Sequence, residues 1–398
     1  MTEHDPLLRF REEFPILARA NYLVSNSLGA MPRGVPGRLA EYADAWATHG
    51  VRAWARDWWG MPGTVGDVVA PLIGAAAGEV VMVPNVTLAQ ATILSAIPYH
   101  GPRNRIVMTA LDFPSVRYVY DRLATRLGAE IIVVPSEDGI CIDGDQLSAA
   151  IDDRTALVAI SQVLFKSAYI VDVAKVIRHA HDAGALVSLD AFHSVGVMPV
   201  DVKALDADFL TGGVLKWLCG GPGGCFTYAN PEVSARLEPA LTGWLAHARP
   251  FGFEPEMEYT AGAYRWLGGT PAIPSIYAAV EGPRIVQSAG IEAIRAKSIR
   301  QTTRLVELAE ARGFRLHAPR DPERRGGTVA FDVPHAYEVA QCLLERDILV
   351  DFRPGAGIRV APHFYTRDAE LEEAVAAIDD ILATGAWSKH EGRSSVVT

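Results

Sequence analysis

The stretch ALVSLDAFHSVGVMPVDVKALDADFLTGGVLKWLCGGPGG covers residues 185–224 and holds an aspartate and a lysine in apolar surroundings. Asp190 ends a strand-like apolar run, and Lys216 lies between a glycine pair and a glycine- and proline-rich loop. Burying a carboxylate or an ammonium is costly unless the group meets a partner. The stretch therefore predicts a site at which Asp190 and Lys216 act on a common partner.

Short β-branched runs alternate with helical stretches on the amino-terminal side of this segment. The runs are apolar throughout, as expected for strands that helices cover on both faces, and lie at 79–83, 105–109, 130–134, 156–161 and 185–190. Helical spacing of apolar residues marks the stretches between them at 87–97, 115–128 and 172–184. Repeated strand–helix units predict an α/β fold with a mainly parallel sheet, whose ligands bind at the carboxyl ends of the strands.

The pattern changes after about residue 282. Two helical stretches come first, followed by GGTVAFDV, a helix over EVAQCLLERD, a strand over ILVDF (348–352), a second strand over IRVAP, and a closing helix over AELEEAVAAIDDIL. This order predicts a smaller α+β domain. We expect an N-terminal segment that joins the small domain, a large domain, the small C-terminal domain and a tail, with boundaries at 1–45, 46–280, 281–390 and 391–398.

The bulk composition excludes several classes of partner. A formal net charge of −10 argues against nucleic acid, which proteins bind with lysine and arginine. No apolar run approaches the roughly 18 residues that span a bilayer, and the first residues lack an apolar signal segment. The four cysteines show no paired spacing, which favours a reducing cytoplasm.

Other motifs give no competing site. His179 and His181 are two residues apart on a predicted helix, so their side chains diverge, and we expect no metal site. GAAAG at 74–78 precedes a strand, whereas a dinucleotide fingerprint follows one. Cys342 lies inside an apolar helical run, which argues against the mobile catalytic cysteine of a desulfurase.

The chemistry of Lys216 and Asp190 suggests one cofactor. A lysine that condenses with an aldehyde no longer carries a full ammonium, and an aspartate can hold a protonated pyridine nitrogen. Both features describe pyridoxal 5′-phosphate (PLP), bound to Lys216 as a Schiff base. His193, three residues after the aspartate, is placed to stack on the ring or hydrogen-bond to it.

The 185–224 segment resembles the cofactor segment of kynureninase and its relatives among the fold-type I, class V aminotransferase-like PLP enzymes. The resemblance extends over nearly the whole chain, through YLVSNSLGAMP (22–32), VTLAQ (86–90), DFPS (112–115), TGWLAH (242–247), RWLGGTP (265–271) and DFRPGAGIRVAPHFYT (351–366). It implies a mainly parallel seven-stranded sheet flanked by helices, and a homodimer with shared active sites.

The resemblance also implies roles for individual residues. Cofactor binding falls to Asp190, His193 and Lys216, to Phe113 as a ring-stacking residue, and to phosphate ligands at Val86, Thr87, Trp244 and Thr270, the last two from the partner subunit. On the substrate side it implies Asn26 and Trp54, with Arg359 holding the substrate carboxylate. Arg353 competes with Arg359 for that role, and Trp54 could equally be a core or interface residue.

Three positions depart from the kynureninase pattern. Leu215, Val116 and Leu164 stand where those enzymes carry polar residues, so the hydrolysis of an aryl ketone is in question while the PLP-binding core is retained.

In the expected reaction the amino-acid substrate displaces Lys216 from the cofactor, and Lys216 then removes the α-proton. Cleavage on the β-carbon side of L-kynurenine or a related amino acid follows. The alternatives are a class V aminotransferase that makes a keto acid and a PLP-binding protein with little turnover.

Overall fold

The computed structural model describes residues 5–99 and 101–392. Its large central sheet has seven strands in the order β2-β8-β7-β6-β5-β3-β4. These are β2 (Val80–Val83), β3 (Arg105–Thr109), β4 (Glu130–Val134), β5 (Thr155–Ser161), β6 (Leu186–Asp190), β7 (Phe209–Gly213) and β8 (Cys225–Ala229). All neighbours run parallel except β8, which is antiparallel to both β2 and β7. The predicted mainly parallel, seven-stranded α/β fold is confirmed.

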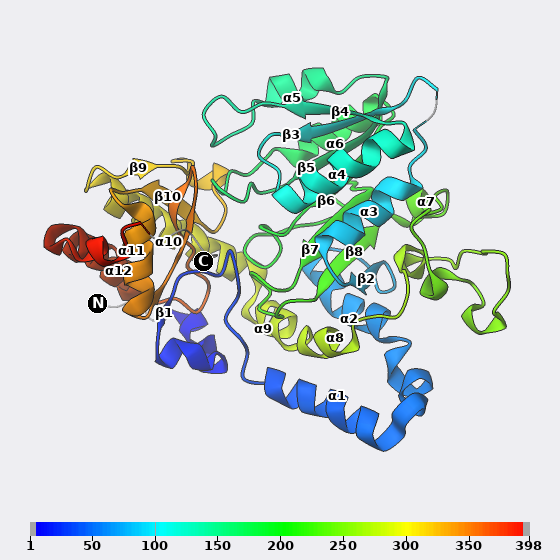
Figure 1. The fold of residues 1–398 in the computed structure, drawn as a ribbon, viewed down its shortest axis with the longest axis horizontal. Helices are drawn as coiled ribbons and strands as arrows, with labels where there is room; N and C mark the ends of the chain where they lie inside the picture. Colours follow the sequence, from blue (N-terminus) through cyan, green and yellow to red (C-terminus); the bar gives the residue numbers. More distant parts are fainter. Residues whose placement is uncertain (1–4, 100, 393–398) are drawn as a thin grey trace.

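Helices cover both faces of this sheet (Figure 1). Alternate residues of each strand belong to different apolar clusters: in β5, Leu157 and Ala159 pack with α3 (Val86–Ala96) and α4 (Pro114–Leu127), whereas Val158 and Ile160 pack on the other side. The helices of that other side are α2 (Met61–Val69), α5 (Gly144–Ala150) and α6 (Val173–Asp182). Burial on both faces explains why the strands read as continuous apolar runs.

A smaller antiparallel sheet lies in the C-terminal part, in the order β12-β13-β10-β9. Its strands are β9 (Arg315–Leu316), β10 (Val329–Asp332), β12 (Asp351–Arg353) and β13 (Gly357–Val360). It packs with the helices α10 (Ile291–Glu310), α11 (Ala336–Glu345) and α12 (Asp368–Thr384) around a separate apolar cluster. Figure 1 shows this part to the left of the large sheet.

The N-terminal segment packs against the small sheet and helices. The strand β1 (Asn21–Tyr22) pairs in parallel with β11 (Ile348–Leu349). Arg11 forms a bidentate ion pair with the buried Glu370 of α12, in which its Nη1 and Nη2 lie 2.9 and 2.5 Å from the two carboxylate oxygens. The segment then passes through α1 (Val35–His49), which runs beneath α8 (Ile273–Ala278) and α9 (Glu281–Ala289) in Figure 1.

The structure corrects one expected strand. ILVDF was expected to be continuous, but Ile348 and Leu349 pair with the N-terminal segment, while Asp351 and Phe352 begin the four-stranded sheet. The other predicted strands are present, and a short helix, α7 (Pro231–Ser234), follows β8. The last six residues of the predicted tail lie outside the described residues. No helix in the described part of the chain combines the length and apolar character needed to span a membrane.

Candidate active site

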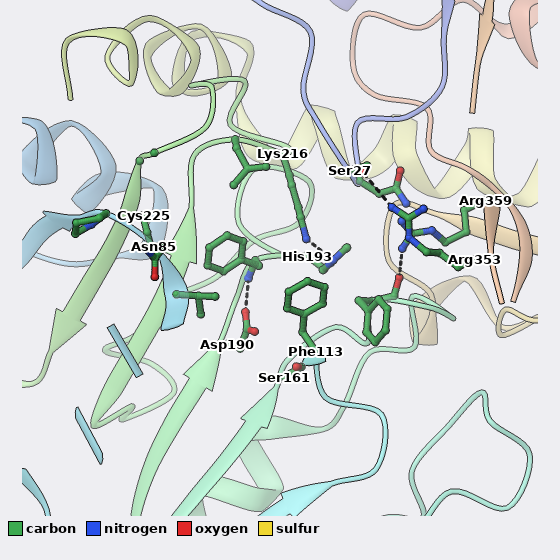
Figure 2. Close-up of a pocket in the computed structure, with 18 residues that line it drawn as sticks. Ser27, Asn85, Phe113, Ser161, Asp190, His193, Lys216, Cys225, Arg353 and Arg359 are labelled. Carbon is green, nitrogen blue, oxygen red and sulfur yellow. Dashed lines mark hydrogen bonds between the residues drawn. The ribbon is translucent and has the colours of Figure 1, made fainter. Parts of the chain in front are cut away.

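A cavity of about 300 Å³ opens at the carboxyl ends of β5, β6 and β7. It receives residues from the N-terminal loop, the large sheet with its loops, and the small domain, because the N-terminal loop and the small domain close over the edge of the large sheet (Figure 2). The lining residues include Asn26, Ser27, Asn85, Val86, Phe113, Ser161, Phe165, Asp190, Phe192, His193, Leu215, Lys216, Cys225, Arg353 and Arg359.

Lys216 projects into this cavity from the turn after β7. Its Nζ lies 2.6 Å from Nε2 of His193 and 5.4 Å from the ring centroids of Phe113 and Phe192. Burial lowers the pKa of Lys216 to about 7, although the nearby Asp190 carboxylate opposes that shift. The amine is therefore neutral in an appreciable fraction of molecules near neutral pH.

Asp190 is the last residue of β6, and its side chain is buried. One carboxylate oxygen accepts a hydrogen bond of 2.9 Å from the backbone N–H of Phe192. Burial raises the pKa of Asp190 to about 6. No ion pair to Asp190 forms within residues 5–99 and 101–392, so this buried carboxylate suits a cationic ligand group.

His193 lies between Lys216 and the two cavity arginines. Burial, and then the charges of Lys216, Arg359 and Arg353, hold the pKa of His193 well below its usual range. The ring is therefore neutral, with one nitrogen able to accept and the other to donate. A neutral ring beside Lys216 leaves that amine unhindered by a second positive charge.

Helix α3 begins at the edge of the cavity. Asn85 caps it, since its side-chain oxygen accepts the N–H of Leu88 at 3.0 Å. Val86 lines the cavity, whereas the side chain of Thr87 is exposed on the first turn and is not part of the lining. The free N–H groups and the dipole of an eleven-residue helix favour an anion such as phosphate here.

Phe113 stands at the start of α4 and meets Phe165 edge to face, with ring centroids 5.3 Å apart. The preceding residue, Asp112, fixes it in place. This buried carboxylate accepts the backbone N–H groups of Thr109 and Ser161, each at 2.7 Å. Asp112 thus ties the loop that carries Phe113 to the ends of β3 and β5.

Two arginines from the small domain reach the cavity. Arg359, on β13, is paired with Asp351, on β12, through contacts of 2.7 and 2.5 Å. Its third nitrogen donates to the carbonyl of Phe165. Arg353 lies 3.1 Å from the same aspartate and 3.4 Å from the hydroxyl of Ser27.

Besides Thr87, three predicted residues lie away from the cavity of their own chain. Thr270 lines a neighbouring cavity of about 310 Å³, which shares Pro84 and Gly223 with the first. Trp244 packs on Trp59 with ring centroids 4.9 Å apart and is 39% exposed, while Trp54 packs edge to face on Trp58. The roles predicted for Trp244 and Thr270 need a second chain, and all three assignments stay predictions.

The three departures from the kynureninase pattern differ in position. Val116 is buried in the apolar cluster between α3, α4 and the sheet, and Leu164 is buried in the cluster on the opposite face. Only Leu215 lines the cavity. The change in polarity at the site of chemistry is therefore confined, within this chain, to the residue before Lys216.

Several lining residues were not predicted from the sequence: Ser27, Asn85, Ser161, Phe165, Phe192 and Cys225. Two of these residues could have been predicted from the sequence. Asn85 directly precedes a helical stretch, as an N-cap does, and Ser161 ends a buried strand just as Asp190 does. Phe165 and Cys225 carried no such signal, because an apolar residue in a loop or at the start of a strand looks like many others before the fold brings it into the cavity.

The cavity fits PLP. It brings together a partly neutral lysine amine, a buried carboxylate with no ion-pair partner among the described residues, an aromatic ring and a helix N-terminus. These groups match the aldehyde, the ring nitrogen, the ring face and the phosphate of that cofactor, respectively.

Comparisons with known proteins place the chain in a family. The Aminotransferase class-V profile matches residues 62–370. The chain is 34% identical to a kynureninase of Burkholderia pseudomallei (strain 1106a), covering 97% of this chain and 95% of the relative, and 32% identical to the kynureninase of Pseudomonas fluorescens, covering 97% and 94%. The expected resemblance is confirmed.

Solved structures agree on the fold. The cysteine desulfurase of Thermococcus onnurineus NA1, in its apo form, superposes with a TM-score of 0.84 at 23% identity over 96% of this chain and 99% of its own. The cysteine desulfurase CsdA of Escherichia coli gives a TM-score of 0.82 at 21% identity, over 95% and 98%. With its profile match, its full-length relatives and its fold in agreement, the chain belongs to the aminotransferase class-V family, on the kynureninase-like side of it.

Proposed function

We propose that this PLP-dependent enzyme cleaves an amino acid on the β-carbon side, with L-kynurenine or a related aryl-keto amino acid as substrate. The observation that carries the proposal is the cavity around Lys216 and Asp190, in a chain that shares 34% of its residues with a kynureninase along nearly its whole length. Both key residues are retained, which argues against a PLP-binding protein with little turnover.

Different residues of the cavity would hold different parts of the cofactor. Lys216 would supply the amine for covalent attachment, Asp190 would pair with the ring nitrogen, Phe113 and His193 would hold the ring, and the α3 N-terminus would bind the phosphate. When bound, PLP supplies an electron-accepting ring that stabilises negative charge on the substrate α-carbon. Asp190 keeps that ring protonated because its carboxylate is buried and gains most from a cationic neighbour.

Lys216 is the proposed proton carrier at the substrate α-carbon. Its pKa of about 7 leaves much of the amine able to accept a proton near neutral pH, and matches a general base to that pH. His193 lies 2.6 Å from the amine and orients it toward the cavity. The surrounding aromatic rings of Phe113 and Phe192 keep water away from that proton.

A second function is favoured by one observation: Leu215 lines the cavity directly beside Lys216 where kynureninases carry a polar residue. Without a polar group there, proton transfer to the leaving fragment has one donor fewer, and transamination to a keto acid becomes the competing outcome. Product analysis separates the two. We expect anthranilate and alanine from L-kynurenine; a keto acid formed only from paired amino-acid and keto-acid substrates would establish the aminotransferase, and no anthranilate would overturn the first assignment.

The same proposal includes a homodimer with shared active sites. Trp244, Thr270 and Trp54 lie outside the Lys216 cavity of their own chain, and Trp244 is exposed beside Phe251 and Phe253, which are 61% and 76% exposed. In a dimer these residues would face the partner's site.

The four free cysteines support a reducing, cytoplasmic location. The domain boundaries at residues 45, 280 and 390 remain proposals.

A further inference from the structure

The turn that carries Lys216 lies between β7 and β8, and it takes part of its hydrogen bonding from other segments. The carbonyl of Lys216 itself accepts the N–H of Cys219 at 3.0 Å within the turn. The carbonyls of the residues before and after it, Leu215 and Trp217, accept donors from distant parts of the chain. Carbonyls that are shielded from water need such donors, so those distant segments fix the orientation of the turn.

The two donors come from opposite ends of the chain. The N–H of Gly29, in the N-terminal loop, donates to the carbonyl of Leu215 at 2.7 Å. Nε2 of His363, in the small domain just after β13, donates to the carbonyl of Trp217 at 2.8 Å. Lys216 is thus held on both sides, once by a main-chain group and once by a side chain.

The contact with Trp217 fixes the protonation of the His363 ring. A carbonyl oxygen only accepts, so Nε2 carries the hydrogen and Nδ1 does not. The residue is 2% exposed, and burial lowers the pKa of His363 to about 3, although the hydrogen bond to Trp217 opposes that shift. The ring is therefore neutral, and its Nε2–H stays available as a donor over the whole pH range in which Lys216 titrates.

Packing alone does not account for a histidine at this position. His363 meets the rings of Trp217 and Phe364 edge to face, with centroids 5.2 and 4.5 Å apart, and a phenylalanine would make such contacts equally well. Its Nδ1 has no hydrogen-bond partner in the part of the chain that the structure describes, and an unpaired buried nitrogen costs stability. What the histidine adds to an apolar ring is the single donor to the residue next to Lys216.

The segment that carries His363 is itself held in place. Thr366 closes a tight turn with it, because its Oγ1 accepts the His363 N–H at 3.0 Å and its own N–H donates to the His363 carbonyl at 2.8 Å. The buried Lys297 of α10 donates to the carbonyl of Phe364 at 2.7 Å. The donor therefore stands on a fixed support, as the accurate placement of a reacting group requires.

We propose that His363 is a positioning residue for Lys216: through the Trp217 carbonyl it holds the turn so that the amine lies beside His193, inside the cavity. His363 is not among the residues that line the cavity, so it acts on the amine through the backbone and not by touching substrate or cofactor. The inference rests on the proposed function, in which Lys216 attaches the cofactor and carries the α-proton. It links the small domain to that amine.

Two variants separate the hydrogen bond from the packing. His363→Phe keeps an aromatic ring but removes the donor, whereas His363→Gln places an amide N–H at about the reach of Nε2 and keeps the donor. The apoenzyme of each variant is acylated over a range of pH. Mass spectrometry follows the labelling of Lys216, whose amine reacts when it is neutral.

The position of the labelling midpoint is the expected result. The wild-type protein and His363→Gln should both show half-maximal labelling of Lys216 at about pH 7. In His363→Phe the turn loses one of its two outside supports, the amine gains access to water, and the midpoint should rise by about one pH unit or more. At pH 7 that shift leaves about one fifth as much neutral amine, so covalent attachment of PLP, followed by absorbance, should slow about fivefold.

Val339→Ala is the matched control for lost stability. Val339 is 0% exposed in the apolar cluster of the small domain, and its truncation lowers the unfolding temperature without touching the Lys216 turn. This variant should keep the wild-type midpoint even where it unfolds at the same temperature as His363→Phe. A merely structural role for His363 would give lower stability with an unchanged midpoint in both variants.

The proposal is overturned if His363→Phe keeps a midpoint at about pH 7, or if His363→Gln shifts as far as His363→Phe. Should His363→Phe not fold, His363→Asn takes its place under the same criteria, because its shorter amide stops short of the Trp217 carbonyl. Failure of the proposed function is distinguishable, since the labelling needs no substrate and that failure appears as absent anthranilate from L-kynurenine.

Discussion

At the scale of single residues, the chemistry of the site depends on the protonation state of the Lys216 amine. Lys216 lies among aromatic rings beside a neutral histidine, and burial outweighs the attraction of Asp190. The sequence singles out this residue because Asp190 and a series of family motifs accompany it; a lone lysine in an apolar run would more often extend its amine to water. Lys216, Asp190, His193, Phe113, Val86, Asn26 and Arg359 all line one cavity, and their roles remain predictions.

Replacing Lys216 with alanine should remove covalent PLP. The purified variant should lack the absorbance of the attached cofactor, and turnover should fall by orders of magnitude because the α-proton loses its acceptor. Absorbance spectra and activity assays measure both effects. Lys203→Ala is the control, since Lys203 pairs with Glu79 at 2.7 Å on the surface; equal loss of bound PLP in both variants would contradict the assignment.

The lowered pKa of Lys216 can be measured in the apoenzyme. Neutral amines react with acylating reagents, and a pKa of about 7 leaves the amine of Lys216 half neutral at pH 7. An ordinary lysine, with a pKa near 10.4, is neutral in roughly one molecule in 2,500 at that pH. Mass spectrometry should show labelling of Lys216 that rises with pH, reaches half of its maximum at about pH 7 and levels off about one pH unit higher.

Lys203 is an internal reference in the same labelling experiment. Partial burial acts to lower its pKa, but the hydrogen bond to Glu79 and the nearby Tyr228 raise the pKa of Lys203 above its ordinary value overall. Its labelling should therefore keep rising at pH values where that of Lys216 is constant. Parallel pH profiles for the two lysines would refute the inferred shift.

At the scale of elements, the site depends on close contacts between loops and helix ends. Individual strands of the large sheet were predictable, because a strand that is buried on both faces consists of consecutive apolar residues. The division of ILVDF was not, since Ile348 and Leu349 pair with residues more than 300 positions away in the chain. Long-range pairing of a two-residue strand leaves no local pattern to recognise.

Gly29 shows how tightly the N-terminal loop meets the Lys216 turn. A Cβ at Gly29 would lie 2.1 Å from the carbonyl oxygen of Lys216 and 2.8 Å from the Cα of Cys219. Gly29→Ala should therefore destabilise the protein by about 2 kcal/mol or more and displace Lys216. Denaturant unfolding measures the first effect, and PLP absorbance the second.

Gly37 supplies the contrast for this substitution. It lies in α1, and a Cβ there would meet nothing within 4 Å. Gly37→Ala should stabilise the protein by roughly 0.5 kcal/mol, because alanine favours a helix more than glycine does. A Gly29→Ala protein as stable as Gly37→Ala would show that the loop does not pack on the Lys216 turn.

The N-terminus of α3 gives a second prediction at this scale. Asn85→Asp retains the side-chain acceptor for Leu88 N–H but adds a negative charge beside the proposed phosphate site. The unfolding free energy of the apoenzyme should change by less than about 0.5 kcal/mol, while the affinity for PLP falls about tenfold. Asn85→Ala should instead lower stability by about 1 kcal/mol; unchanged PLP affinity in Asn85→Asp would place the phosphate elsewhere.

At the scale of the whole molecule, the cavity is assembled from the N-terminal loop, the large sheet and the small domain. The alternation of strands and helices was enough to predict the two sheets. It could not predict which loops meet, because Asn26, Phe165 and Arg353 come together only through the tertiary packing of distant segments. For the same reason, spacing in the sequence assigns Trp54 to neither chain, and the assignment of Trp244 and Thr270 to the partner subunit rests on the family resemblance alone.

Mixing two inactive variants tests the shared site. In a homodimer whose partner supplies Thr270 near the phosphate, Lys216→Ala and Thr270→Asp should each be inactive alone. A hybrid dimer would hold one site with both defects and one with neither. Random exchange of equal amounts should therefore restore about a quarter of wild-type activity, because half of the dimers are hybrids with one intact site. No recovery, despite subunit exchange verified by differential tags and native mass spectrometry, would mean that Thr270 serves the cavity of its own chain.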